Sequence, residues 1–353
     1  MTASPARLAA RLLRGGGKKR ERPRRRRRVV VTVTAATVAV LATIGAAALA
    51  LRAEYAGETD PVARTRGRDA VWLGHAWVDG RRTMADVDAL AARVRGTGVR
   101  DLYVHAGPLD VDGRLDPARY ARAGWAIRAL RSAIPGVRIQ AWLGQRVGKG
   151  ALDLDAPATR GSILASARQV LDAGFDGVHY NFEPVPDGDR GLLALLGDTA
   201  AIAHPLSAVV SMSCHQVEPL PGMNAVDDVL VGRHKWWTPG YLRQVARRVD
   251  QVAIMSYDTA LPVRSLYGGY VRRQTEVALR AVPQKTDLLM GLPAFHTDDL
   301  GHHASAETVG AAVRGVRLAL GHGSRQSFGV AMYVDFAAID LDWSAYRRGW
   351  GAE

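Results

Sequence analysis

The stretch "GFDGVHYNFEPV", residues 174–185, places three polar side chains at alternate positions within an apolar segment. If the segment forms a strand, His179, Asn181 and Glu183 point to one face and the apolar residues between them to the other. Burying an imidazole, an amide and a carboxylate side by side costs free energy unless each group finds a partner. The row therefore indicates a functional site along a strand whose other face lies in the core.

Short apolar runs like this one recur through the chain and alternate with stretches of helical period. Eight such runs occupy residues 70–78, 99–107, 137–145, 177–185, 206–217, 251–258, 287–295 and 328–336. This alternation predicts a parallel sheet covered by helices, and eight units in 285 residues predict a (β/α)8 TIM barrel, which takes about 250 residues. A doubly wound open sheet is the alternative, but "GHAWVDGRR", residues 74–82, is not the Gly-rich turn that it needs.

Two of the intervening stretches show the helical period clearly. Thr83 followed by Asp86 is typical of a helix start. Apolar residues then line one face of each predicted helix: Met84, Val87, Leu90 and Val94 in the first, and Val309, Val313, Val316 and Leu320 in the second.

The formal net charge of +13 is concentrated at the N-terminus. Residues 1–28 carry 12 of the 47 Lys and Arg residues but only one of the 34 Asp and Glu residues. The rest of the chain is therefore nearly neutral and has no bulk electrostatic reason to bind a phosphate backbone. We expect no nucleic-acid partner.

An uncharged stretch of 23 residues, 29–51, follows the basic tail directly. About 20 apolar residues span a lipid bilayer as a helix, and a basic flank stays in the cytoplasm. The stretch exceeds the ~7–15 residues of a usual signal core, which favours an uncleaved anchor. The sequence thus predicts a cytoplasmic tail (1–28), a single transmembrane helix (29–51) in the cell membrane, a linker (52–68) and an extracellular catalytic domain (69–353).

In a TIM barrel the active site lies at the carboxyl ends of the strands. The polar and aromatic residues expected there are His75, Trp77, His105, Gln145, Glu183, His215, Tyr257, Asp258, His296, Tyr333 and Asp335. Glu183 stands out among them because it ends a row whose inner members are too deep to reach bulk water.

The motif "FDGVHYNFE" resembles the fourth-strand signature of family 18 glycoside hydrolases, the chitinases and endo-β-N-acetylglucosaminidases. That signature reads Asp-Gly-x-Asp-x-Asp-x-Glu, and Asp176, Gly177 and Glu183 match it. The two middle aspartates of the family are His179 and Asn181 here.

Two later segments strengthen the resemblance. "IMSYD", residues 254–258, is similar to the Met-x-Tyr-Asp of the family's sixth strand, and "LLMGLPAF", residues 288–295, is similar to its seventh strand. Strand order and spacing fit the family over about residues 70–345. The resemblance therefore implies a TIM-barrel glycoside hydrolase.

The resemblance also implies roles for individual residues. The substrate would be a glycan containing N-acetylhexosamine, whose own acetamide acts as the nucleophile. Glu183 would be the general acid, with Asp176 and His179 completing the catalytic motif. Asn181 would orient the acetamide and Tyr257 would donate a hydrogen bond to its oxygen.

Further residues would hold the sugar. Asp258 is expected to contact it, with Asp335 as a second acidic candidate. Trp77, Trp142 and Tyr333 are the candidate stacking faces, and Tyr333 stands nearest to the tryptophan of the family's eighth strand. For Trp142 a role in the core is an equal alternative. No cofactor is implied.

The spacing of the polar row fits these roles physically. Residues two apart on a strand lie ~6.6 Å apart, so Glu183 can reach a leaving oxygen while Asn181 reaches the adjacent acetamide. A general acid must be protonated at working pH, and burial achieves this by raising its pKa. Because a protonated His179 would oppose that shift, we expect His179 to be neutral and hydrogen-bonded.

Three alternatives stay open at this stage. One is a catalytically inactive barrel that binds a glycan, and another is a retaining glycosidase that uses Asp258 or Asp335 as a second carboxylate. Metal-dependent hydrolysis is disfavoured because the first strand has only His75 instead of a His-x-His pair. The neighbours His302 and His303 rarely chelate one ion in a loop, so we expect no metal.

Overall fold

The computed structural model describes residues 22–220, 222–224, 236–321, 323 and 325–351. Most of the predicted basic tail, residues 1–21, lies outside this range. The chain forms two compact units, Met1–Ala50 and Leu51–Glu353. Helix α1 (Arg22–Tyr55) includes the predicted anchor and the first part of the predicted linker. Among the described residues, no helix is both long enough and apolar enough to cross a membrane.

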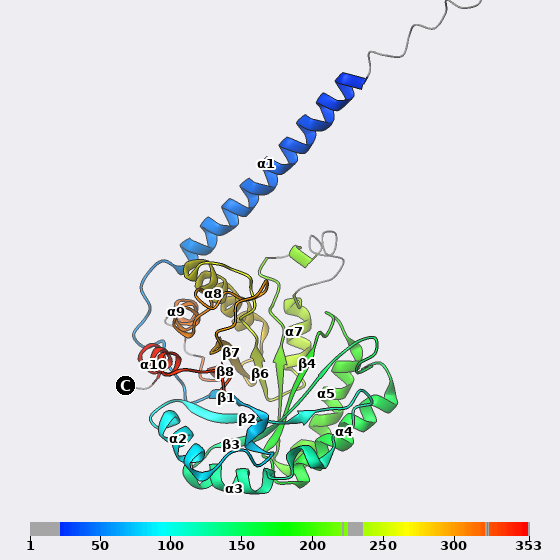
Figure 1. Ribbon diagram of the computed structural model, residues 1–353, viewed down its shortest axis with the longest axis vertical. Helices are drawn as coiled ribbons and strands as arrows, with labels where there is room; N and C mark the ends of the chain where they lie inside the picture. The colour runs from blue at the N-terminus through cyan, green and yellow to red at the C-terminus, as the bar shows by residue number, and fades with distance from the viewer. Residues whose placement is uncertain (1–21, 221, 225–235, 322, 324, 352–353) are drawn as a thin grey trace, which may run out of the picture. The chain divides into compact units, whose positions relative to one another are not determined.

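The second unit contains the predicted TIM barrel. Eight parallel strands follow one another in sequence order around a closed barrel, and β8 pairs with β1 (Figure 1). The strands are β1 (Asp69–Leu73), β2 (Val99–Pro108), β3 (Arg138–Arg146), β4 (Gly177–Glu183), β5 (Val209–Cys214), β6 (Gln251–Ile254), β7 (Asp287–Pro293) and β8 (Phe328–Tyr333). The closed order excludes the doubly wound alternative.

Helices surround the barrel and cover its outer face (Figure 1). They are α2 (Met84–Val94), α3 (Ala123–Ala133), α4 (Pro157–Asp172), α5 (Arg190–Ala203), α7 (Pro239–Ala246), α8 (Arg264–Ala281), α9 (Val309–Leu320) and α10 (Asp340–Gly349). Helix α2 begins as expected, because Asp86 accepts a hydrogen bond from the Thr83 N–H at 2.8 Å. Its predicted face is correct except for Met84, which is 49% exposed at the first helical position. All four residues of the predicted α9 face are buried.

Strand β4 confirms the alternation predicted for it. Val178, Tyr180 and Phe182 are fully buried in the apolar layer between the barrel and its helices. His179, Asn181 and Glu183 therefore point into the barrel, where the register pairs His179 with Ser211 of β5. The interior of this barrel is consequently polar along β4.

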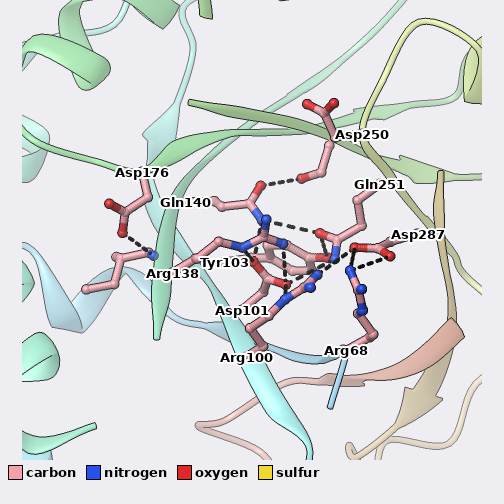
Figure 2. Close-up of polar contacts among 12 residues, drawn as sticks. Arg68, Arg100, Asp101, Tyr103, Arg138, Gln140, Asp176, Asp250, Gln251 and Asp287 are labelled. Atoms are coloured by element: carbon pink, nitrogen blue, oxygen red, sulfur yellow. Dashed lines mark hydrogen bonds and ion pairs between the residues drawn. The ribbon is translucent and has the colours of Figure 1, made fainter. Parts of the chain in front are cut away.

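A charged network closes the amino-terminal end of the barrel (Figure 2). The buried carboxylate of Asp101 accepts hydrogen bonds from Arg138 at 2.7 and 2.8 Å, from Gln140 at 2.9 Å and from Gln251 at 3.1 Å. Because each oxygen of this buried carboxylate is paired, the network is a structural seal. The cavity lined by Asn181 and Glu183 lies at the other end of the barrel.

Candidate active site

The imidazole of His179 lies in the middle of the barrel and is fully buried. Its Nδ1 lies 2.7 Å from the Ser211 hydroxyl, and its Nε2 lies 3.0 Å from the indole nitrogen of Trp72. The ring also stacks on Tyr103 at 3.7 Å between ring centroids. These contacts fix the ring on every side.

The same contacts assign the tautomer of His179. An indole N–H only donates, so Nε2 must accept from Trp72 and the proton resides on Nδ1. Ser211 agrees with this assignment, because its hydroxyl accepts from Nδ1 and donates to Gln140 at 2.6 Å. Burial lowers the pKa of His179 to about 3, so the ring is neutral at physiological pH. The expected neutral, hydrogen-bonded His179 is confirmed.

Asn181 lies above His179, one pleat nearer the barrel mouth. Its side-chain oxygen is buried and accepts no hydrogen bond from the described residues, although the residue lines the cavity. A buried acceptor without a donor is unfavourable. The amide oxygen is therefore prepared to accept a hydrogen bond from a ligand in the cavity.

Glu183 ends the strand at the cavity mouth. The side chain is exposed toward the cavity, while protein atoms surround it elsewhere. This partial burial raises the pKa of the Glu183 carboxyl, and the charge of Asp258 raises it further. A hydrogen bond from Asn181 acts in the opposite direction. The net upward direction is the one that a general acid requires.

Two stacked tyrosines also line the cavity. Tyr257 follows β6 and Tyr333 ends β8, and their rings lie 5.4 Å apart with an angle of 20° between them. Burial raises the pKa of Tyr257 well above its ordinary range, and Tyr333, Glu183 and Asp258 act in the same direction. The hydroxyl of Tyr257 therefore stays protonated and can donate a hydrogen bond.

These residues enclose a cavity of about 260 Å³. Its lining residues come from the carboxyl ends of four strands and comprise Asn181, Glu183, His215, Gln216, Met255, Tyr257, Asp258 and Tyr333. The structure thus brings together six of the predicted residues at the predicted end of the barrel, namely Asn181, Glu183, His215, Tyr257, Asp258 and Tyr333.

Trp77 and Asp335 do not take the sugar-binding roles predicted for them. Trp77 lies in the short helix η1 (His75–Trp77) and is only 3% exposed, so it has no free face for stacking. Its indole N–H donates to the Asp335 carboxylate at 2.8 Å, and the Gly74 N–H donates to the same carboxylate at 2.7 Å. The Asp335 carboxylate is therefore hydrogen-bonded within the protein, and it is not available as the second carboxylate of a two-carboxylate mechanism.

Trp142 lies inside the barrel on β3 and is 8% exposed. Its ring contacts His105 at 4.5 Å between centroids and is absent from the cavity lining. The alternative of a core role for Trp142 is the one that the structure favours. Tyr333 is the single predicted stacking residue that lines the cavity.

Asp176 is at the wrong end of the barrel for catalysis. It precedes β4, and its carboxylate accepts from the backbone N–H of Ile139 at 2.8 Å and pairs with Arg131 at 2.5 Å. These contacts join the start of β4 to β3. The matching aspartate of the motif is a structural residue here, so its assignment as catalytic was wrong.

The remaining polar residues predicted at the mouth have protein partners. His75 contacts the His105 carbonyl at 3.0 Å, His296 contacts Asp342 at 2.9 Å, and Gln145 donates to the Leu109 carbonyl. None of them lines the cavity described above.

The sequence interpretation missed Gln216 and Met255 as lining residues. Gln216 follows β5, donates to the Tyr257 carbonyl at 2.5 Å and accepts from the Tyr270 hydroxyl at 2.6 Å. The signal available for it was its position directly after His215 at a strand end. Met255 lies within the quoted "IMSYD" motif, but that motif directed attention to Tyr257 and Asp258.

Comparison with known proteins agrees with this architecture. No protein-family profile and no curated protein matches the chain. Among solved structures, the spore cortex-lytic enzyme SleL of Bacillus megaterium shares the fold with a TM-score of 0.57 and 12% identity, covering 82% of this chain and 75% of SleL.

Two chitinases match similarly. The chitinase of Chromobacterium violaceum gives a TM-score of 0.53 at 16% identity, over 80% of this chain and 98% of its own. A class V chitinase from Pseudomonas fluorescens gives a TM-score of 0.55 at 14% identity, covering 80% of this chain and 98% of its own. The chitinase-like barrel implied by the sequence motifs is thus confirmed as a fold.

Proposed function

We propose that the barrel is a glycoside hydrolase that cleaves a glycan containing N-acetylhexosamine, with Glu183 as the general acid. The observation that carries the proposal is the convergence of three groups on one cavity. These are a carboxyl with a raised pKa (Glu183), a buried amide oxygen without a donor (Asn181) and a protonated phenol (Tyr257). An acetamido sugar offers an oxygen to protonate, an N–H for Asn181 and a carbonyl for Tyr257.

The chemistry proceeds in two steps in this proposal. Glu183 gives its proton to the glycosidic oxygen while the acetamide carbonyl attacks C1, so the leaving sugar departs and a cyclic oxazolinium ion forms. Asn181 accepts a hydrogen bond from the acetamide N–H, and Tyr257 donates one to its carbonyl. The Glu183 carboxylate then takes a proton from water as that water attacks C1, which restores the acid and retains the anomeric configuration.

Asp258 completes the substrate site in the same proposal. Its side chain is 56% exposed and lines the cavity beside Glu183, so it can accept hydrogen bonds from sugar hydroxyls. It is also the remaining candidate second carboxylate for a two-carboxylate mechanism.

We also propose that residues 29–51 anchor the enzyme in the cell membrane. The support is an uncharged stretch of 23 residues after a basic tail, a pattern that places the tail in the cytoplasm. The proposed catalytic barrel then faces the extracellular side.

The decisive experiment compares two substrates on the full-length protein in detergent. Chitin oligomers and peptidoglycan fragments are offered with their N-acetyl groups intact and after de-acetylation. Cleavage of only the acetylated forms is the expected result. Equal cleavage of both would mean that a second carboxylate such as Asp258 is the nucleophile, and binding without cleavage of any would identify a glycan-binding barrel.

A further inference from the structure

Three potential metal ligands converge beside the cavity. Asp258 follows β6, His302 lies in the loop after β7, and Glu307 precedes α9. The Nδ1 of His302 lies 3.1 Å from a carboxylate oxygen of Asp258 and 3.3 Å from the Oε2 of Glu307. One ligand atom from each residue lies within 4.8 Å of the other two.

The two inner members are buried and incompletely satisfied. The side chains of His302 and Glu307 are 1% and 0% exposed. The Nε2 of His302 makes no hydrogen bond to a described residue, and beyond the contacts of the His302 Nδ1 with the two carboxylates neither that Nδ1 nor the Oε2 of Glu307 makes one. A buried polar atom that lacks a hydrogen-bond partner costs free energy. A ligand that contacts these atoms would therefore stabilise the cluster.

Neighbouring groups hold these side chains in place. The other oxygen of Glu307 accepts from the backbone N–H of Thr259 at 3.0 Å and from its hydroxyl at 2.9 Å. The His302 ring stacks on Phe295 at 4.2 Å between centroids. The Oε2 of Glu307 and the imidazole are therefore fixed toward each other, as the ligands of a metal site must be.

The composition of the cluster also suits a cation. Two carboxylates and one imidazole are ligand types that bind a divalent metal ion, and such an ion can balance the charge of two carboxylates.

We propose that Asp258, His302 and Glu307 bind one divalent metal ion of the Zn²⁺ type. Zn²⁺ bonds of about 2.1 Å in a tetrahedral arrangement place neighbouring ligand atoms about 3.4 Å apart, close to the two separations of 3.1 and 3.3 Å. An imidazole with two carboxylates suits Zn²⁺ better than Mg²⁺ or Ca²⁺, which take oxygen ligands alone. The site does not depend on the proposed hydrolase activity.

The test is a direct measurement of metal binding. Full-length protein carrying an affinity tag without histidines is stripped with a chelator and dialysed against Zn²⁺, and bound zinc is counted by mass spectrometry and titrated by calorimetry. We expect one zinc per chain in the wild type and in the control His303→Asn, which changes the neighbouring histidine outside the cluster. Glu307→Gln and Asp258→Asn should each weaken binding by more than about 100-fold, since both remove a direct ligand.

Two outcomes overturn the proposal: a wild type without stoichiometric zinc, or variants that bind zinc as tightly as the wild type. Asp258→Asn keeps the test valid if Glu307→Gln does not fold, because Asp258 is half exposed. X-ray absorption of the zinc-loaded wild type supplies an independent readout. It should show one imidazole together with oxygen ligands at about 2.0–2.2 Å, and a shell without imidazole contradicts the assignment.

Discussion

The role of Glu183 can be tested by a single isosteric change. Glu183→Gln keeps the shape of the side chain but removes the transferable proton. General acid–base catalysis by one positioned group is worth about 10²–10⁴-fold, so turnover should fall by that factor while oligomer binding persists. Rates and dissociation constants of the full-length protein check this. Glu58→Gln, at an exposed position before the barrel, is the control and should leave both unchanged.

The pH profile of the reaction follows from the raised pKa of Glu183. The acid is active while protonated, so kcat should fall as pH rises through this pKa. Asp258→Asn removes a negative charge that raises the pKa of Glu183, and the alkaline limb should therefore move to lower pH. Only the pH at which the alkaline limb falls is compared between the variant and the wild type, because Asp258 also lines the cavity and its replacement can change kcat itself. An unmoved limb would contradict the electrostatic link.

Substitutions of Asn181 distinguish a catalytically active site from an inactive barrel that only binds a glycan. Asn181→Ala should lower turnover on acetylated substrate, because the acetamide N–H loses its acceptor. Asn181→Asp restores the usual residue of the resembling family and should retain activity with a shifted pH optimum. If neither change alters the rate, Asn181 does not hold the acetamide.

At the scale of elements, strand β4 carries a buried neutral histidine whose protonation opposes folding. The pKa of His179 is about 3 in the folded chain against 6.5 ordinarily. The unfolded chain therefore binds more protons between these values, and stability falls as pH drops below 6.5. His179→Gln should make this slope shallower by up to about 1.4 kcal/mol per pH unit. Urea denaturation followed by fluorescence checks it, since all eight tryptophans lie at or beyond Trp72.

The network at the amino-terminal end of the barrel should be the most costly polar element to break. Asp101→Ala leaves Arg138 without its buried partner and should lower the free energy of unfolding by roughly 3–5 kcal/mol. Asp172→Ala, which breaks the exposed pair with Arg168, is the control and should cost about 1 kcal/mol or less. Similar losses in the two variants would mean that the network is not a structural seal. Because the pKa of Asp101 is lowered in the fold, its contribution should disappear as pH falls through that pKa.

At the scale of the whole molecule, the proposed anchor predicts which side of the membrane the barrel occupies. Protease added to intact cells should remove a C-terminal epitope, because the basic tail is retained in the cytoplasm. Protection of the epitope until the cells are lysed would reverse the proposed orientation. A cytoplasmic protein followed in the same cells confirms that the membrane was intact.

Much of the barrel could be predicted because its strands and helices follow from local patterns of apolar residues. Apolar runs that alternate with helical periods lead to parallel strands covered by helices, and alternation along β4 places His179, Asn181 and Glu183 on the inner face. The end of the barrel that holds the site follows from strand direction alone. Met84 was misplaced because the exposure of a first helical residue depends on its neighbours.

The sequence by itself determined the strand order, the inward row of β4 and the end of the barrel that holds the cavity, since each follows from periodicity and chain direction. Only the tertiary structure decided which polar side chains form hydrogen bonds or ion pairs within the protein. Trp77 and Asp335 lie 258 positions apart and become partners when β8 closes against β1. Asp258, which follows β6, likewise reaches His302 and Glu307, which share the loop between β7 and α9, only in the folded barrel. Such pairings depend on barrel closure, and no local pattern of residues encodes them.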